Sequence, residues 1–191
     1  AKGKCTTDHI SPAGKWLEYR GHLDKISDNM FSGAVNAFND KVGKGKNMLT
    51  GNEEEFSVIA RDYLKNGKGW IAVGDVNYGE GSSREHAAME PRYLGCRAVL
   101  AKSFARIAET NLKKQGILPL WFTSESDYGK ILEEDVADID STVKVGEPVY
   151  VTLKHADGSV EVLETKHTFS SEQLEWFRYG SALNWLREKN S

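Results

Sequence analysis

The alternation of apolar runs and helical stretches between residues 70 and 122 constrains the fold more than any other feature. The apolar runs are three to six residues long, which suits buried strands, and the stretches between them have the spacing of helices. The expected order is strand, helix, strand, helix, strand, over residues 70–73, 83–89, 98–100, 104–114 and 117–122. This order predicts βαβ units and therefore an α/β fold with a parallel sheet.

The chain before this region has a weaker pattern. Residues 1–50 are rich in glycine and asparagine and lack apolar periodicity, so they are expected to form a loop-rich segment with one short helix. A helix is predicted next, with Asn52 as its cap and Gly67 at its end. Within the alternating region, Pro91 is expected to end the second helix.

The chain after this region predicts a hairpin and helices. An Asp-Gly pair at 157–158 lies between two alternating runs, which is a hairpin signal. Ser170 and Gln173 have the spacing of a capping box at the start of a helix, and Gly180 separates it from a second helix over 181–188. Because 191 residues suit one domain, residues 1–191 are expected to form a single domain with 1–50 packed on its α/β core.

Composition excludes several classes of function. The 25 basic and 28 acidic residues give a net charge of −3, which disfavours a nucleic-acid partner. No apolar run approaches the ~20 residues of a membrane helix, so no membrane partner is expected.

The first residue is not Met, and the chain is expected to be a fragment or a processed product. Upstream targeting information would then lie outside it.

The two cysteines, Cys5 and Cys96, do not form a metal motif. They stand 91 positions apart with no Cys-x-x-Cys pair. Two thiolates cannot hold an iron–sulfur cluster, which takes three or four. We expect no metal ligands in this chain and two reduced thiols, with a single disulfide as the alternative.

The densest chemical signal is the segment 74–86, Gly-Asp-Val-Asn-Tyr-Gly-Glu-Gly-Ser-Ser-Arg-Glu-His. It follows a predicted strand and precedes a predicted helix, where ligands bind in open α/β sheets. Ser82, Ser83 and Arg84 could bind a carboxylate or phosphate there, helped by free amide groups of the helix start. The segment is neither a P-loop nor a dinucleotide fingerprint. Its purely structural alternative is a capping box made by Ser82 and Glu85.

A second cluster lies near the N-terminus. Asp8 and His9 could form an acid–base pair, although a turn made by Asp8 or Ser11 is the favoured interpretation. The remaining histidines are isolated in the sequence and are expected to be surface or core residues.

Four segments together resemble the aconitase family, specifically its C-terminal swivel domain and most closely the mitochondrial type. They are Thr-Thr-Asp-His-Ile-Ser at 6–11, the glycine-rich segment extended through Glu90-Pro-Arg, the segment with residues 102–107 and 109–116, and the C-terminal segment with residues 167–169 and 175–184. The resemblance covers nearly the whole chain.

The resemblance implies a fold and a reaction. The fold is a three-layer α/β swivelling domain that closes over an active site. The reaction interconverts citrate and isocitrate through cis-aconitate, at a [4Fe–4S] cluster held by the other aconitase domains. A tricarboxylate substrate, those other domains as partners, and a mitochondrial matrix location are all implied in the same way.

The resemblance also implies residue roles. Ser82 matches the serine that removes the proton, while Ser83, Arg84 and Arg20 match groups that bind the substrate. Asp8 and Ser11 match supporting residues of the active site. A serine acts as a base only where its alkoxide is stabilised, and arginines with free amides can do that.

Three alternatives remain open. Pro12 and Lys15 depart from the family pattern, which leaves a homoaconitase-type hydratase acting on a longer tricarboxylate as one of them. The second is the small subunit of an isopropylmalate isomerase, although such subunits lack the 6–11 segment. The third is an isolated domain that serves as a protein-interaction module.

Overall fold

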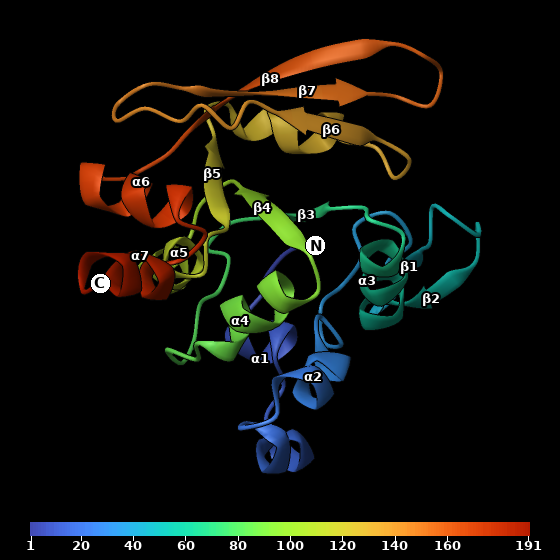
Figure 1. Cartoon of the computed structure of the whole chain (residues 1–191). Coiled ribbons are helices and arrows are strands. Elements are labelled where there is room, and N and C mark those ends of the chain that lie inside the picture. The colour runs from blue at the N-terminus through green and yellow to red at the C-terminus, as the bar shows by residue number, and fades with distance from the viewer.

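A six-stranded sheet forms the centre of the computed structural model, which describes all 191 residues (Figure 1). Its strand order is β3-β4-β5-β8-β7-β6. The strands β3 (Trp70–Gly74), β4 (Cys96–Ala101) and β5 (Leu118–Phe122) run parallel. This half of the sheet confirms the predicted α/β class with a parallel core.

The other half of the sheet is antiparallel. It consists of β6 (Val136–Ile139), β7 (Val149–Lys154) and β8 (Val160–Lys166). The predicted hairpin is β7–β8, and β8 also pairs with β5, so the hairpin extends the main sheet. The edge strand β6 was not predicted, because it is only four residues long and Asp138 interrupts its apolar residues.

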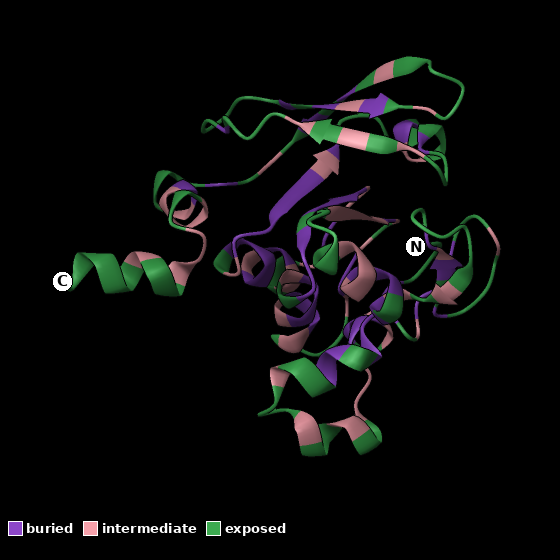
Figure 2. Cartoon of the chain, turned by 45° about the vertical axis from the view of Figure 1, so that its right-hand side comes forward, coloured by how far each residue is buried: buried purple, intermediate pink, exposed green.

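Two hydrophobic clusters divide the molecule into layers. Successive side chains of a strand face opposite sides of the sheet. Val99 and Ala101 of β4 therefore pack in a cluster with the helices, while Ala98 and Leu100 pack in a second cluster with β7 and β8. The parallel strands thus lie between a helical layer and the antiparallel strands, which cross the top of the view in Figure 1. Figure 2 shows the buried residues concentrated along this central layer.

The first fifty residues contain several short helices, where the sequence predicted one. Each has three to six residues, too few to produce an apolar period. They are α1 (Thr7–Ile10), the 3-10 helix η1 (Gly14–Tyr19), α2 (Leu23–Ile26) and the 3-10 helix η2 (Ser27–Asn29). They lie beneath α4, at the bottom of Figure 1.

The helix α3 (Phe56–Lys65) begins later than predicted. Asn52 is not its cap, because β2 (Glu53–Glu55) comes first and pairs with β1 (Lys44–Lys46). The predicted end is confirmed, since Asn66 is the C-cap and Gly67 follows with φ of +69°.

The helix α4 (His86–Tyr93) also differs from its prediction. It begins three residues later than expected and continues past Pro91. The proline costs this short helix one backbone hydrogen bond, to the carbonyl of Ala87. The predicted helix start at residue 83 fails because Ser82 to Arg84 keep an irregular backbone, in which the Arg84 amide donates to the Ser82 carbonyl at 2.7 Å.

The remaining helices follow their predictions closely. The helix α5 (Arg106–Lys114) precedes β5, and the 3-10 helix η3 (Glu125–Lys130), which was not predicted, follows it. The capping box at Ser170 and Gln173 is present at the start of α6 (Ser171–Arg178). The last helix, α7 (Ala182–Lys189), has no buried residue, and Figure 2 shows it mostly exposed.

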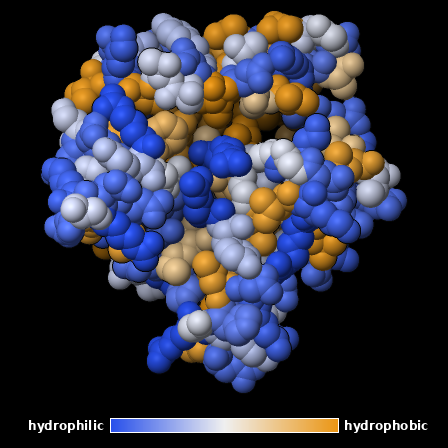
Figure 3. Space-filling view, in the orientation of Figure 1, coloured by the Kyte–Doolittle hydropathy of each residue, from blue (hydrophilic) through white to orange (hydrophobic).

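The surface contains no large apolar feature on the side facing the viewer in Figure 3. Apolar side chains there are scattered in small groups among hydrophilic ones. None of the helices combines the length and the apolar character that crossing a bilayer would require.

Candidate active site

The loop between β3 and α4 lies against the N-terminal segment. The Gly79 amide donates to the Cys5 carbonyl at 2.8 Å, and the Thr7 amide donates to the Glu80 carbonyl at 2.9 Å. These backbone bonds hold α1 against the loop although about 75 positions separate the two in sequence. The two clusters singled out in the sequence therefore form one site.

Two glycines make this close contact possible. Gly79 has φ of +81°, and a Cβ there would lie 2.3 Å from the Ala108 Cβ on α5. Gly81 has φ of +119°, and a Cβ there would lie 3.0 Å from Thr7 Oγ1. Both positions favour glycine on two grounds, conformation and space. These two glycines therefore allow the loop to pack closely against α5 and α1 of the same chain.

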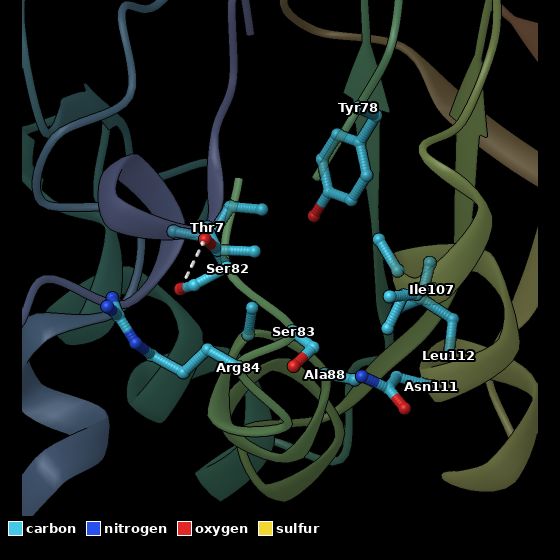
Figure 4. Close-up of a pocket in the computed structure, with 12 residues that line it drawn as sticks. Thr7, Tyr78, Ser82, Ser83, Arg84, Ala88, Ile107, Asn111 and Leu112 are labelled. Carbon is cyan, nitrogen blue, oxygen red and sulfur yellow. Dashed lines mark hydrogen bonds between the residues drawn. The ribbon is translucent and has the colours of Figure 1, made fainter. Parts of the chain in front are cut away.

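Ser82 and Ser83 are both exposed on this loop. Ser82 Oγ lies 3.4 Å from Thr7 Oγ1, and Figure 4 shows the two side chains facing each other. The capping-box alternative for Ser82 and Glu85 is wrong: Glu85 is the N-cap of α4, and no side chain caps this helix. The Ser82 hydroxyl is therefore exposed and is not used to cap a helix.

Free backbone donors accompany the serines. The amides of Ser83 and Glu85 donate no hydrogen bond within the chain. They precede the first residue of α4, where the helix dipole favours negative charge. The start of this helix can therefore receive an anion next to the two hydroxyl groups.

A small pocket lies under the loop (Figure 4). Its cavity of about 10 Å³ is lined by Ser82, Ser83 and Asn111 among others, and it is roughly large enough for one water molecule. Tyr78 points its hydroxyl toward this space, and that buried oxygen has no hydrogen-bond partner. A larger ligand has to bind on the exposed side of the serines instead.

Arg84 connects the loop to α1. Its Nη1 donates to Asp8 Oδ1 at 2.7 Å and to the Ser11 carbonyl at 2.5 Å. The side chain of Arg84 is 21% exposed, so the guanidinium is only partly shielded. Since only Nη1 is engaged, the rest of the fork is available to a carboxylate.

The predicted turn made by Asp8 or Ser11 is not observed, because residues 7–10 form the helix α1 and the two side chains bond elsewhere, Asp8 to Arg84 and Ser11 to Glu90. Thr6 caps α1, and the His9 ring accepts the Thr6 amide at 3.1 Å, which completes a capping box. Asp8 pairs with Arg84 instead of His9. The acid–base pair is therefore not formed.

Arg20 joins the site only through its backbone. Its carbonyl accepts a hydrogen bond from His86 Nε2 at 2.8 Å, at the first residue of α4. Its guanidinium is exposed and makes no hydrogen bond or ion pair within the chain. The structure thus brings Asp8, Ser11 and Arg84 together and gives the Arg20 side chain no hydrogen bond to them.

The histidines that the sequence left isolated all have partners. The most strongly held is His155, whose Nδ1 lies 2.6 Å from Asp135 Oδ1 and whose Nε2 lies 3.2 Å from Glu161 Oε2. The hydrogen bond to Asp135, followed by that to Glu161, raises the pKa of His155. This cluster lies in the antiparallel half of the molecule and is separate from the serine loop.

Glu90 was missed by the sequence analysis. It is fully buried, and its Oε2 accepts the Ser11 hydroxyl at 2.5 Å, while its Oε1 has no partner. Burial raises the pKa of Glu90 to about 8, against smaller opposing effects of Ser11 and Arg84. The sequence does contain a signal for its burial, because the apolar residues Ala87 and Leu94 stand three positions before and four positions after it, on the same helix face.

The residues of this chain do not fit an iron–sulfur cluster. Both cysteines are free and buried in the core. Burial raises the pKa of Cys5 to about 11 and that of Cys96 to about 12, so neither supplies a thiolate near neutral pH. No group of three or more His, Cys, Asp or Glu side chains is placed to hold a metal ion.

Fold and site together define a class: an α/β domain that presents two serines and an arginine on a loop that precedes a helix. The family model described as the aconitase C-terminal domain matches residues 1–125. The chain belongs to this family, and the resemblance seen in the sequence is confirmed.

Similar curated proteins include several that are named mitochondrial aconitate hydratases. The chain is 54% identical over 97% of its length to a probable one from Caenorhabditis elegans, and 54% identical over 99% to one from Aspergillus fumigatus. It is 52% identical over 98% of its length to that of Saccharomyces cerevisiae. The chain spans about a quarter of the length of these relatives, 24% in each case.

A solved structure shares the fold. The chain superposes on a 3-isopropylmalate dehydratase from Methanocaldococcus jannaschii with a TM-score of 0.64, covering 97% of this chain and 87% of that one. The sequence identity between the two is 24%, so the likeness concerns the fold alone.

Proposed function

We propose that this chain is the C-terminal domain of an aconitate hydratase, and that it supplies the proton-transferring serine and the carboxylate-binding groups of that enzyme. Family membership and the names of relatives more than 50% identical support the reaction class. The observation that carries the assignment of residues is the exposed pair Ser82 and Ser83 beside Arg84, with unpartnered amides at the start of α4.

The reaction we propose interconverts citrate and isocitrate through cis-aconitate. In this scheme Ser82 Oγ, as an alkoxide, removes a proton from the carbon next to a substrate carboxylate. The negative charge that develops moves onto that carboxylate, where Arg84 and the free amides stabilise it. In the reverse direction Ser82 returns the proton to the same carbon.

The remaining site residues have supporting roles in the proposal. Ser83 and Arg20 bind other carboxylate oxygens of the substrate, and Arg20 is free to turn because its guanidinium has no partner in the chain. Asp8 and Ser11 hold Arg84. No step is assigned to a cluster bound by this chain, because its thiols do not fit one.

We further propose that the [4Fe–4S] cluster of the enzyme is held by its other domains. The loss of the substrate hydroxyl then takes place outside this chain. The exposed serines would meet the substrate at the surface between this domain and the others, since the cavity of about 10 Å³ is too small for a tricarboxylate. The names of the relatives favour a mitochondrial location.

The test compares the complete enzyme with the isolated chain. The complete enzyme, reconstituted with iron and sulfide, is expected to convert citrate to isocitrate, while the isolated chain is expected to be iron-free and inactive. Turnover by the isolated chain would refute the division of roles. Homocitrate and isopropylmalate are assayed in parallel, and a preference for either would replace citrate by that substrate class.

A further inference from the structure

Glu90 is the one buried carboxyl in direct contact with the residues that hold Arg84. It lies on α4, is fully buried, and accepts the Ser11 hydroxyl at Oε2. Ser11 is also fully buried, and its carbonyl accepts Arg84 Nη1 at 2.5 Å. A continuous series of contacts therefore leads from the interior of α4 to the guanidinium at the site.

The surroundings of Glu90 do not favour a charged carboxylate. Its Oε1 is buried without a hydrogen-bond partner, and an ionised group left in this way costs several kcal/mol. Among the charged groups, Arg84 opposes the effect of burial and lowers the pKa of Glu90. The elements packed against α4 carry further charged residues: Asp24 and Lys25 of α2, Asp28 of η2, Arg97 of β4, and Arg106, Glu109, Lys113 and Lys114 of α5.

We propose that Glu90 is a positioning residue for anion binding: as an uncharged carboxyl it fixes Ser11, and through Ser11 it fixes Arg84, without neutralising the arginine. This inference rests on the proposed function of Arg84 as a carboxylate-binding group. The raised pKa of Glu90, about 8, agrees with an uncharged state at neutral pH.

In this role Glu90 has to be uncharged, so that the positive charge of Arg84 stays available to the anion. A carboxylate at this position would attract the guanidinium and compensate its charge, in competition with the substrate. An uncharged carboxyl keeps the hydrogen bond to Ser11 and leaves the positive charge for the anion. Anion binding is then expected to weaken as Glu90 ionises, at pH values around and above 8.

Steady-state kinetics of the complete enzyme from pH 6.5 to 9.5 test the proposal. The KM of the parent for citrate is expected to rise about tenfold across this range, in line with the loss of one partly shielded charge interaction. Glu90→Gln stays uncharged and is expected to flatten the rise. Glu90→Ala loses the contact with Ser11 and is expected to raise KM at pH 7, where Glu90→Gln restores it toward the parent value.

A matched control is Glu109→Gln. Glu109 is another buried carboxyl, and it accepts hydrogen bonds from Thr168 and Trp121 instead of from Ser11. It is expected to keep the pH profile of the parent. Parallel KM profiles for the parent and Glu90→Gln would overturn the proposal. So would an unchanged KM in Glu90→Ala accompanied only by a lower melting temperature.

A second measurement needs no catalysis. The guanidinium NMR signals of Arg84 in this chain are expected to shift with pH near 8 in the parent and not in Glu90→Gln. If the complete enzyme proves inactive on citrate while this shift is present, the proposed function fails and the coupling of Glu90 to Arg84 stands. If the enzyme is active and the shift is absent, the coupling fails alone.

Discussion

At the scale of single residues, Ser82 carries the most specific prediction. Substituting Ser82→Ala in the complete enzyme removes the group that accepts the proton, so kcat is expected to fall by at least about a hundredfold with little change in KM. The structure removes the competing explanation, because Ser82 caps no helix. Thermal melting of the variant is therefore expected to match the parent, and a normal kcat would show that Ser82 is not the base.

Arg84 allows a test of geometry against charge. The sequence placed it inside a helix start, but it precedes α4 by two residues and is held by Asp8 and the Ser11 carbonyl. Arg84→Lys keeps the charge and loses the planar fork, so it can no longer hold these partners and a carboxylate together. Losing one charged hydrogen bond weakens binding by roughly 1.5–3 kcal/mol.

The expected result for Arg84→Lys is therefore a KM raised about tenfold or more, with folding unchanged. Initial rates over a range of citrate concentrations measure it. A KM within a factor of two of the parent would mean that the fork does not hold the substrate.

At the scale of elements, the loop before α4 depends on Gly79. An alanine there meets both a positive φ and the Ala108 Cβ at 2.3 Å, so Gly79→Ala is expected to destabilise the fold by roughly 2 kcal/mol or more. Gly158 is the matched control, since it has φ of +87° with no atom within 4 Å of an added Cβ. Urea denaturation of both variants separates steric overlap from conformation, and equal losses would exclude the overlap.

The elements that depend on short-range sequence signals were predicted correctly. The parallel strands, the hairpin at 157–158, the capping box at Ser170 and the end of α3 at Gly67 follow from apolar runs, turn chemistry and caps. The start of α4 could not be predicted in this way. Ser82 contacts Thr7, a residue 75 positions away, and no local signal in the sequence predicts that contact.

The same difference between local signals and long-range contacts applies to the candidate site. The motif identified Ser82, Ser83, Arg84, Asp8 and Ser11, and the structure places them on facing segments. Tyr78 and Glu90 were not predicted because their importance comes from burial without a full set of partners. Burial of that kind depends on how the N-terminal segment packs on α4.

At the scale of the whole molecule, Glu90 makes stability depend on pH. Its pKa of about 8 lies above the ordinary 4.5, so the folded chain binds more protons than the unfolded chain between these values. The free energy of unfolding therefore falls as pH rises through this window. The slope from this group approaches about 1.4 kcal/mol per pH unit.

Denaturant titrations of the parent and Glu90→Gln at pH 5, 6.5 and 8 isolate this effect, because all other groups are shared. The advantage of the parent over the variant is expected to shrink as pH rises. A constant difference between the two would mean that Glu90 ionises in the folded chain as it does in water.

The contact between α1 and the loop before α4 has a consequence for how the protein folds. The parallel strands close over twenty to thirty residues, whereas the site needs two segments about 75 residues apart to meet. Long chain closures form late and are slow. We therefore expect the amides of α1 to exchange with deuterium through local opening, well before those of β4, so that the site assembles last and opens first.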